Sequence, residues 1–245
     1  MNRIGRYIFI SLLVVVISQS ISAQQTVTFK AEDGLDVTAD LYLMDLNYPY
    51  IILLHQAGYS RGEYREIAPR LTNLGYNCLA VDLRSGNEVN GVVNQTHQLA
   101  QGKGLKTDYI AAINDVEAAI AYVKSRTDKP FVLWGSSYSA SLALIVGTND
   151  LRTAAVVSFS PGEYFDDKDF VKNQIKRISV PVLVLSAKSE CASVNELVSV
   201  VNPNLVTKYC PSEPGKHGAK ALWSSSPFSD DYWLAVTMFF SKLKK

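Results

Sequence analysis

Residues 131–140 read Phe-Val-Leu-Trp-Gly-Ser-Ser-Tyr-Ser-Ala, and this stretch decides the fold class. Its first four residues are apolar and predict a buried strand. Gly135, Ser137 and Ser139 then approximate the G-x-S-x-G pattern, in which a sharp strand-to-helix turn exposes a serine. Small residues are needed two positions before and after that serine, because the strand and helix backbones approach closely there. Gly135 meets this need, and Ser139 departs from the usual glycine but is still small.

Ser136 is the competing candidate for the exposed serine. It would place Trp134 at the position that needs a small residue, which disfavours it. The same letters also fit a serine-rich turn that only caps a helix. The apolar strand before the turn and the apolar helix after it favour Ser137 as a nucleophile.

Strands and helices alternate on both sides of this stretch. The apolar run 50–54 predicts a strand buried on both faces of a sheet, and the spacing of apolar residues over 107–126 predicts a helix. A hairpin turn at Asp33-Gly34 precedes them. Alternation of this kind predicts one α/β domain whose mostly parallel sheet is covered on both faces and entered by an antiparallel hairpin. The other expected elements are strands at 27–29, 37–43, 76–81, 131–134, 153–159, 180–185 and 205–209, and helices at 63–75, 137–146 and 231–244.

Length and composition exclude several classes of protein. The chain has 245 residues, of which 47% are hydrophobic and 19% charged, with a formal net charge of +1. The apolar fraction is too high for a disordered chain. A near-zero charge without a basic stripe argues against nucleic-acid binding. One globular domain, residues 24–245, is the expected organisation.

Residues 1–23 have the pattern of a secretory signal peptide. Arg3 and Arg6 form a positive segment, residues 8–17 are apolar, and Ile21-Ser22-Ala23 fits a cleavage site. A membrane-spanning helix needs about 20 apolar residues, so this run is short for one. We expect cleavage, export to the periplasm or the exterior, and no stable membrane insertion afterwards. An uncleaved anchor is the alternative.

Three cysteines follow the expected cleavage site. Cys78 lies in an apolar run and is expected to be a buried free thiol. Cys191 and Cys210 lie at loops or strand ends, and in an oxidising compartment they are candidates for a disulfide. Sequence spacing alone leaves that pairing open, because it does not fix the distance between the two Cα atoms.

A serine hydroxyl is a weak nucleophile and needs a base. The chain has three histidines. His55 ends an apolar strand, and His97 lies in a polar stretch expected to be a solvated loop. His217 lies in a loop after the last expected strand, where the chain order Ser, acid, His places the base.

The acid that orients the base is expected between them, after the strand at 180–185. Glu190 is the candidate there, and Asp166, Asp167 and Asp169 are the competitors from the preceding segment. A carboxylate at this place accepts a hydrogen bond from the imidazole and fixes its tautomer. A bridge between the two later cysteines would tie the acid loop to the segment that leads to His217.

The developing charge on a substrate carbonyl needs two hydrogen-bond donors. One is expected from the backbone N–H of Tyr138, and the other from the loop 55–58. His55 is expected to orient this loop and not to serve as the base.

These segments resemble the α/β-hydrolases, and most closely the small serine esterases similar to dienelactone hydrolase. The resemblance covers nearly the whole chain after residue 23. It rests on His55-Gln56-Ala57-Gly58, Val81-Asp82-Leu83-Arg84, Gly135-Ser136-Ser137-Tyr138-Ser139, Val180-Pro181-Val182-Leu183-Val184-Leu185 leading to Glu190, and His217-Gly218.

The resemblance implies an α/β-hydrolase fold, with a twisted sheet of about eight strands and no large lid. It also implies a triad of Ser137, Glu190 and His217, with Ala57 and Tyr138 as oxyanion donors. Asp82 and Arg84 match a motif that is usually structural. The chain departs from the family pattern in having Gln56 after His55 in place of the usual His-Gly pair. Glu replaces the usual Asp as the acid, and dienelactone hydrolases proper use a cysteine nucleophile.

The sequence therefore predicts a secreted serine hydrolase that cleaves a carboxylic ester of a small molecule through an acyl-enzyme. No metal, organic cofactor or nucleic-acid partner is expected. A peptidase or thioesterase with the same triad is one alternative. A non-catalytic binding protein on the same fold is another, because a fold alone does not establish activity.

Overall fold

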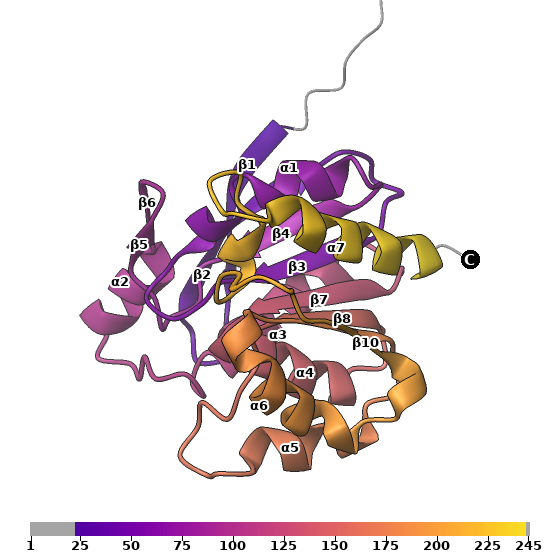
Figure 1. The fold of residues 1–245 in the computed structure, drawn as a ribbon. Helices are drawn as coiled ribbons and strands as arrows, with labels where there is room; N and C mark the ends of the chain where they lie inside the picture. Colours follow the sequence, from indigo (N-terminus) through magenta and orange to yellow (C-terminus); the bar gives the residue numbers. More distant parts are fainter. Residues whose placement is uncertain (1–22, 244–245) are drawn as a thin grey trace, which may run out of the picture.

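The hydrophobic alternation of the sequence produces one eight-stranded sheet in the computed structural model, which describes residues 23–243 (Figure 1). The strand order is β1-β2-β4-β3-β7-β8-β9-β10. β1 (Ala23–Lys30) pairs antiparallel with β2 (Asp36–Leu43), which pairs antiparallel with β4 (Asn77–Val81). All later pairs are parallel. The predicted mostly parallel sheet with an antiparallel entry is confirmed. The signal peptide expected at residues 1–23 lies outside the described residues except for Ala23, which begins β1.

The central strands are buried along their whole length. Every residue of β3 (Tyr50–Leu54), β4 and β7 (Phe131–Ser136) is buried. The sheet continues through β8 (Thr153–Phe159), β9 (Val182–Leu185) and β10 (Val206–Tyr209). Continuous apolar runs form these strands because helices cover both of their faces.

Helices lie on the two faces of the sheet in separate groups. The side chains of α1 (Ile67–Thr72) and α7 (Ser229–Leu243) pack in one core cluster, and Figure 1 shows these helices on the same side of the sheet. Those of α3 (Ile113–Lys124), α4 (Tyr138–Asn149) and α6 (Cys191–Leu197) pack in the other. The predicted coverage of both faces is confirmed.

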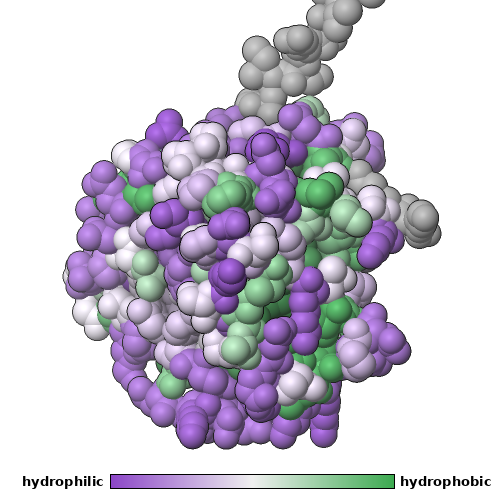
Figure 2. Space-filling view, viewed as in Figure 1, coloured by the Kyte–Doolittle hydropathy of each residue, from purple (hydrophilic) through white to green (hydrophobic). Residues whose placement is uncertain are grey.

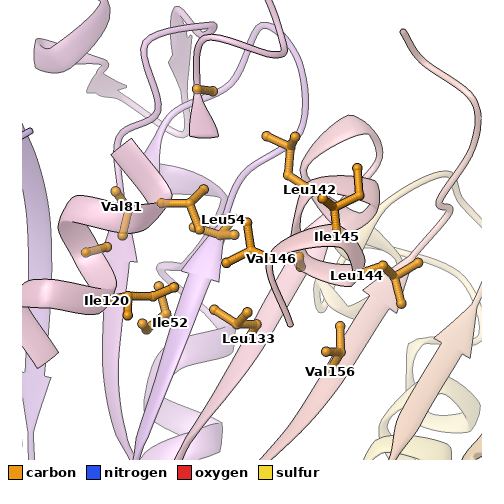
Figure 3. Close-up of a cluster of buried hydrophobic side chains, with 14 of the residues drawn as sticks. Ile52, Leu54, Val81, Ile120, Leu133, Leu142, Leu144, Ile145, Val146 and Val156 are labelled. Carbon is orange, nitrogen blue, oxygen red and sulfur yellow. The ribbon is translucent and has the colours of Figure 1, made fainter. Parts of the chain in front are cut away.

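Alternate residues of one strand supply the two clusters. Ile52 and Leu54 of β3 point toward α3 and α4, where they meet Ile120 and Val146 (Figure 3). Their neighbours Ile51 and Leu53 belong to the cluster under α1 and α7. This is the two-residue period of a strand with an apolar layer on each side. Burial of side chains of this size contributes about 1.5–3 kcal/mol each.

Two expected helices are shorter than predicted. The segment 63–75 contains a 3-10 turn, η1 (Arg61–Tyr64), and the six-residue α1. The helix expected at 107–126 begins only at Ile113, because Tyr109 lies in the preceding loop and stacks on Tyr138 with ring centroids 4.4 Å apart.

The polar stretch read as a solvated loop is a helix, α2 (Gln95–Gly102), so the prediction for His97 was wrong. Asn94 caps this helix by accepting a hydrogen bond from the His97 N–H at 2.8 Å. The His97 ring is half-buried, and its Nδ1 lies 2.5 Å from the carbonyl oxygen of Arg84. An asparagine cap is a recognised start signal, and it was available in the sequence.

A small ribbon of β5 (Glu88–Val89) and β6 (Val92–Val93) also lay outside the predictions. Asn90 and Gly91 form its turn with φ of 53° and 71°. Asn-Gly is a strong two-residue hairpin signal, because both positions require the left-handed region.

Asp82 and Arg84 form buried ion pairs after β4. Asp82 accepts a hydrogen bond from the Arg61 guanidinium at 2.5 Å, and Arg84 pairs with Asp115 at 2.8 Å and with Asp33 at 2.6 Å. The geometry agrees with the structural role that the motif predicts.

The surface is mixed. Figure 2 shows hydrophilic residues with apolar patches between them. Within residues 23–243, no helix combines the length and the apolar character needed to cross a bilayer.

Candidate active site

The carboxyl ends of β3 and β7 define the site. The chain passes from β3 to β4 on one side, and then returns to place β7 on the other side of β3. The connections that leave these two strand ends therefore diverge. In open α/β sheets the crevice at such a switch point is where ligands bind.

Ser137 stands at this point, between β7 and α4. Its φ of 60° and ψ of −125° are the strained geometry of a sharp strand-to-helix turn. A Cβ at Gly135 would lie 2.3 Å from the carbonyl oxygen of Ser139 and 2.4 Å from the Cα of Ala140. Only glycine fits at this position, as the pattern predicted.

Ser139, where the pattern usually has glycine, has a structural task. Its hydroxyl accepts a hydrogen bond from the Ser136 N–H at 2.9 Å and lies 2.8 Å from the carbonyl oxygen of Leu54. The hydroxyl therefore joins the turn after β7 to the end of β3. The departure from the pattern preserves the turn.

His217 lies between Ser137 and Glu190. Its Nε2 is 2.8 Å from the Oγ of Ser137, and its Nδ1 is 2.6 Å from the Oε1 of Glu190. A carboxylate only accepts, so Nδ1 carries the proton and Nε2 accepts from the serine hydroxyl. The structure brings together the three side chains that the sequence singled out.

Glu190 is held by further donors. Its Oε2 accepts hydrogen bonds from the Ser160 hydroxyl at 2.6 Å and from the Ala187 N–H at 3.0 Å. Burial opposes ionisation of Glu190, but hydrogen bonds from His217, Ser160 and Ala187 outweigh it and hold the pKa of Glu190 below its ordinary value. The acid is ionised at neutral pH.

Ser160 is a site residue that sequence reasoning missed. It follows β8 with φ of 53°, its hydroxyl donates to Glu190, and it accepts from the Gly218 N–H at 3.0 Å. Its position at the end of a strand beside β7 was the available signal.

The competing residues take no part in the contacts that join Ser137, His217 and Glu190. The His55 ring is fully buried: Nδ1 donates to the carbonyl oxygen of Gln56, and Nε2 accepts from the Leu83 N–H, both at 2.8 Å. Burial lowers the pKa of His55 to about 4, so the ring stays neutral and orients its loop as predicted. Asp166, Asp167 and Asp169 lie in or beside the loop before α5 (Phe170–Gln174). Among residues 23–243, the carboxylate hydrogen-bonded to the His217 ring is that of Glu190.

Ser136, the other candidate serine, points away from His217 into a buried network. Its hydroxyl donates to Glu63 at 2.8 Å and accepts from the Ala219 N–H at 2.8 Å. Glu63 had no signal in the sequence.

The expected oxyanion donors flank Ser137. Tyr138 is the first residue of α4, and the first N–H groups of a helix have no acceptor within it. The loop 55–58 leaves β3 beside the turn, and Ala57 in it is half-buried. The positive end of the α4 dipole favours negative charge at this place.

Cys191 and Cys210 form a disulfide with their Cα atoms 5.9 Å apart, and Cys78 is a buried free cysteine as predicted. Within the described residues, no cluster of three or more His, Cys, Asp or Glu side chains is suited to hold a metal ion.

A cavity of about 470 Å³ lies beside the site. Tyr164 lines this cavity and also contacts the site. Its hydroxyl donates to the carbonyl oxygen of Ser160 at 2.8 Å. Burial raises the pKa of its phenol, and a hydrogen bond with the Ser137 side chain lowers it. Another cavity, of about 460 Å³, lies between α3 and α4 and is lined by none of the site residues. The residues that line the cavity beside the site are Lys106, Asp108, Tyr109, Ile110, Tyr164, Phe165 and Asp166.

Solved structures share this fold. An esterase of Pyrococcus furiosus, Pf2001, superposes with a TM-score of 0.68 at 20% identity, over 90% of this chain and 92% of that one. A dienelactone hydrolase of Anabaena variabilis gives a TM-score of 0.69 at 14% identity, over 90% of this chain and 97% of that one. At these identities the likeness is one of fold.

A curated relative is the quorum-quenching protein AidA of Acinetobacter baumannii strain MDR-ZJ06, which is 30% identical over 165 residues. The match covers 64% of this chain and 51% of AidA, so the chain spans about half the length of that relative. The model of the dienelactone hydrolase family matches residues 40–207, which include the turn at Ser137 and the candidate acid Glu190. With this match over more than half of its length and an α/β-hydrolase sheet to carry it, the chain belongs to the dienelactone hydrolase family.

Proposed function

We propose that this protein is an exported serine hydrolase that cleaves carboxylic esters through an acyl-enzyme on Ser137. The observation that carries the proposal is the placement of His217, 2.8 Å from the Ser137 hydroxyl and 2.6 Å from Glu190. Membership of the dienelactone hydrolase family and the fold shared with an esterase also support hydrolase activity.

The reaction follows from these contacts. Nε2 of His217 takes the hydroxyl proton as Ser137 Oγ attacks the ester carbonyl carbon. Glu190 stabilises the imidazolium that forms. The imidazolium then gives the proton to the alkoxide that leaves, which completes the acyl-enzyme. Water, deprotonated by the same imidazole, attacks the acyl carbon, and the imidazolium returns the proton to Ser137 Oγ as the bond between that oxygen and the acyl carbon breaks, which releases the acid and the free serine.

Charge on the carbonyl oxygen needs donors during both attacks. The N–H groups of Tyr138 and Ala57 are proposed for this role. Loss of one such donor costs about 10²–10³-fold in kcat in hydrolases of this chemistry.

The cavity beside Ser137 is proposed to hold the substrate. Tyr109, Tyr164 and Phe165 give it an aromatic wall, and charged residues lie at its edge. Such a wall fits an apolar acyl or ring portion, with the ester at its open end. A lactone is a cyclic ester and undergoes the same attack. The name of the family, dienelactone hydrolase, favours a lactone as a candidate substrate.

The test is intact mass after treatment with a fluorophosphonate, together with turnover of a short-chain nitrophenyl ester and a panel of lactones. The wild-type protein is expected to gain one adduct and to hydrolyse the nitrophenyl ester. Ser137→Ala is expected to lose both properties. Ser125→Ala changes an exposed serine at the end of α3 and is the matched control.

Absence of an adduct and of turnover in folded protein would favour the binding-protein alternative. An adduct that survives Ser137→Ala would identify another serine. Turnover of a thioester or a peptide above that of every ester and lactone would favour the thioesterase or peptidase alternative.

Export is proposed from the pattern of residues 1–23. The test is expression of the full chain with fractionation and N-terminal sequencing. Mature protein that begins at Gln24 outside the cytosol supports cleavage. Protein that keeps residue 1 and sediments with membranes would support the anchor.

A further inference from the structure

We propose that Glu63, acting through Ser136, is a positioning residue for the active site. The pair joins two segments, the oxyanion loop (residues 55–58) and the base loop (residues 214–219), to the turn that carries Ser137. The inference rests on the proposed function, because it concerns the geometry of that same site.

Glu63 binds the oxyanion loop directly. It belongs to η1, and its side chain is fully buried. Its Oε2 accepts a hydrogen bond from the Gln56 N–H at 2.8 Å, and its Oε1 accepts from the Ser136 hydroxyl at 2.8 Å. One carboxylate thus fixes the residue before Ala57 and the residue before Ser137.

Ser136 extends the link to the base loop. Its hydroxyl accepts from the N–H of Ala219, two residues after His217, at 2.8 Å. Gly218 has φ of 74°, and a Cβ there would lie 2.7 Å from the Ser136 Oγ. The base loop therefore lies directly against this hydroxyl.

A second hydroxyl holds the same loop in the same way. Ser160 accepts from the Gly218 N–H and donates to Glu190. Two successive N–H groups of the base loop thus bind two serines at the ends of adjacent strands, and each serine donates to a carboxylate. Glu190 is hydrogen-bonded to the His217 ring. Glu63 binds the N–H of Gln56, the residue before Ala57, and Ser136 links it to the N–H of Ala219, two residues after His217.

The ionisation of Glu63 links this network to pH. Burial raises the pKa of Glu63 to about 7, and it is opposed by the hydrogen bonds from Gln56 and Ser136 and by the charges of Lys220 and His217. The phenols of Tyr64 and Tyr138 also face it, and both are neutral because burial raises the pKa of each. An ionised carboxylate accepts both hydrogen bonds. The neutral acid must use one oxygen as a donor, which reverses or weakens one of the two contacts.

The experiment compares Glu63→Gln and Ser136→Ala with wild-type protein, using the nitrophenyl ester. Both variants are expected to lower kcat by about 10- to 100-fold, the cost of misplacing reacting groups by up to an ångström, with a smaller effect on KM. Ser158→Ala is the matched control: Ser158 is a buried serine of β8 whose hydroxyl donates to the carbonyl oxygen of Ala140, and within residues 23–243 this hydroxyl has no hydrogen bond to either loop. It is expected to keep wild-type kcat.

The pH profile separates positioning from general loss of structure. In wild-type protein kcat is expected to fall as the pH is lowered through about 7, because Glu63 takes up a proton there and one of its two hydrogen bonds is weakened. Glu63→Gln is expected to lack this part of the pH dependence. Circular dichroism and thermal melting establish that each variant is folded.

An active wild-type protein whose two variants keep its kcat and its pH profile overturns the inference. Should neither variant fold, the wild-type profile decides, and a kcat that does not fall as the pH is lowered through about 7 overturns it. Wild-type protein that neither reacts with fluorophosphonate nor cleaves any ester removes the proposed function itself, which is a different result.

Discussion

Cys191, the residue directly after the proposed acid Glu190, is bonded to Cys210, the residue directly after β10. The chain that leaves Cys210 reaches His217 seven residues later. The bond thus connects the segment that carries the acid to the segment that carries the base. It gives the site a covalent tie in addition to the hydrogen bond between Glu190 and His217.

Reduction of this disulfide is expected to lower both stability and activity. The bond closes a loop over a sequence separation of 19, for which chain entropy gives about 3 kcal/mol of unfolding free energy. Looser placement of the acid is expected to lower kcat several-fold. Urea unfolding and ester turnover, with and without reductant, measure the two effects. The double variant Cys191→Ser and Cys210→Ser is the control and should not respond to reductant. Unchanged stability and kcat in fully reduced protein would contradict the prediction.

Glu190→Gln is expected to lower kcat by about four orders of magnitude, as when the acid of a serine protease triad becomes its amide. The hydroxyl of Ser160 and the N–H of Ala187 both donate to Oε2, so the amide oxygen must take that place. The amide NH₂ then faces Nδ1 of His217, and the ring adopts the tautomer that cannot accept the Ser137 proton. Steady-state kinetics measure the loss.

Glu190→Asp is the matched comparison, because it keeps the charge and shortens the reach by one methylene. It is expected to retain more activity than the amide. Equal activity of the two variants would show that the charge and tautomer do not matter.

Gly218→Ala is expected to inactivate the enzyme with only a modest loss of stability. The backbone of Gly218, with φ of 74° and ψ of −176°, lies in a region almost restricted to glycine and costs alanine about 1–3 kcal/mol, and the Cβ would also press on Ser136 and Gln56. Gly104→Ala is the control, since Gly104 has φ of 65° but nothing within 4 Å of a Cβ. Both variants should remain folded, with Gly218→Ala melting at the lower temperature, and only Gly218→Ala should lose kcat. Equal kcat in both would mean that the contact with Ser136 is unimportant.

Replacing Glu63 is expected to change how stability depends on pH. Burial raises the pKa of Glu63 from its ordinary value of 4.5 to about 7, so the folded protein binds the extra proton between these values. The contribution of Glu63 to the free energy of unfolding therefore falls as pH rises through this window, by on the order of 3 kcal/mol. The Glu63→Gln variant has no carboxyl group at this position, so its free energy of unfolding does not fall with pH for this reason. Its stability relative to wild type is expected to increase from about pH 5 to about pH 8.

The measurement is urea unfolding of both proteins at a series of pH values. Burial lowers the pKa of His55 from 6.5 to about 4, and its contribution to stability is lost as pH falls through that window. This opposing slope is present in both proteins, so the difference between them isolates Glu63. A difference that is constant with pH would contradict the prediction.

Local sequence patterns predicted the strands and the turn at Ser137, but they did not predict every helix boundary. The apolar runs 50–54 and 131–134 form strands that helices cover on both faces. Every position of these strands is therefore buried and can be apolar, which gives a continuous apolar run in place of an alternating pattern. Residues 107–112 continue a helical pattern, yet a stacking contact of Tyr109 with Tyr138 keeps them in a loop. The Asn94 cap and the Asn90-Gly91 turn were readable signals for elements that the predictions left out.

The α/β class and the strand-turn-helix that presents Ser137 follow from the sequence alone, because backbone sterics and side-chain periodicity act over neighbouring residues. The sequence also limited the candidates for the base to His217 and for the acid to Glu190, each with a few competing residues. Which of these side chains meet depends on the packing of segments that are distant in the chain: Ser137 and His217 are 80 residues apart, and His217 and Glu190 are 27 apart. Glu63 emerges only from the folded structure, because a buried polar contact between distant loops depends on how the strand ends are arranged in the sheet and leaves no periodic trace in the sequence.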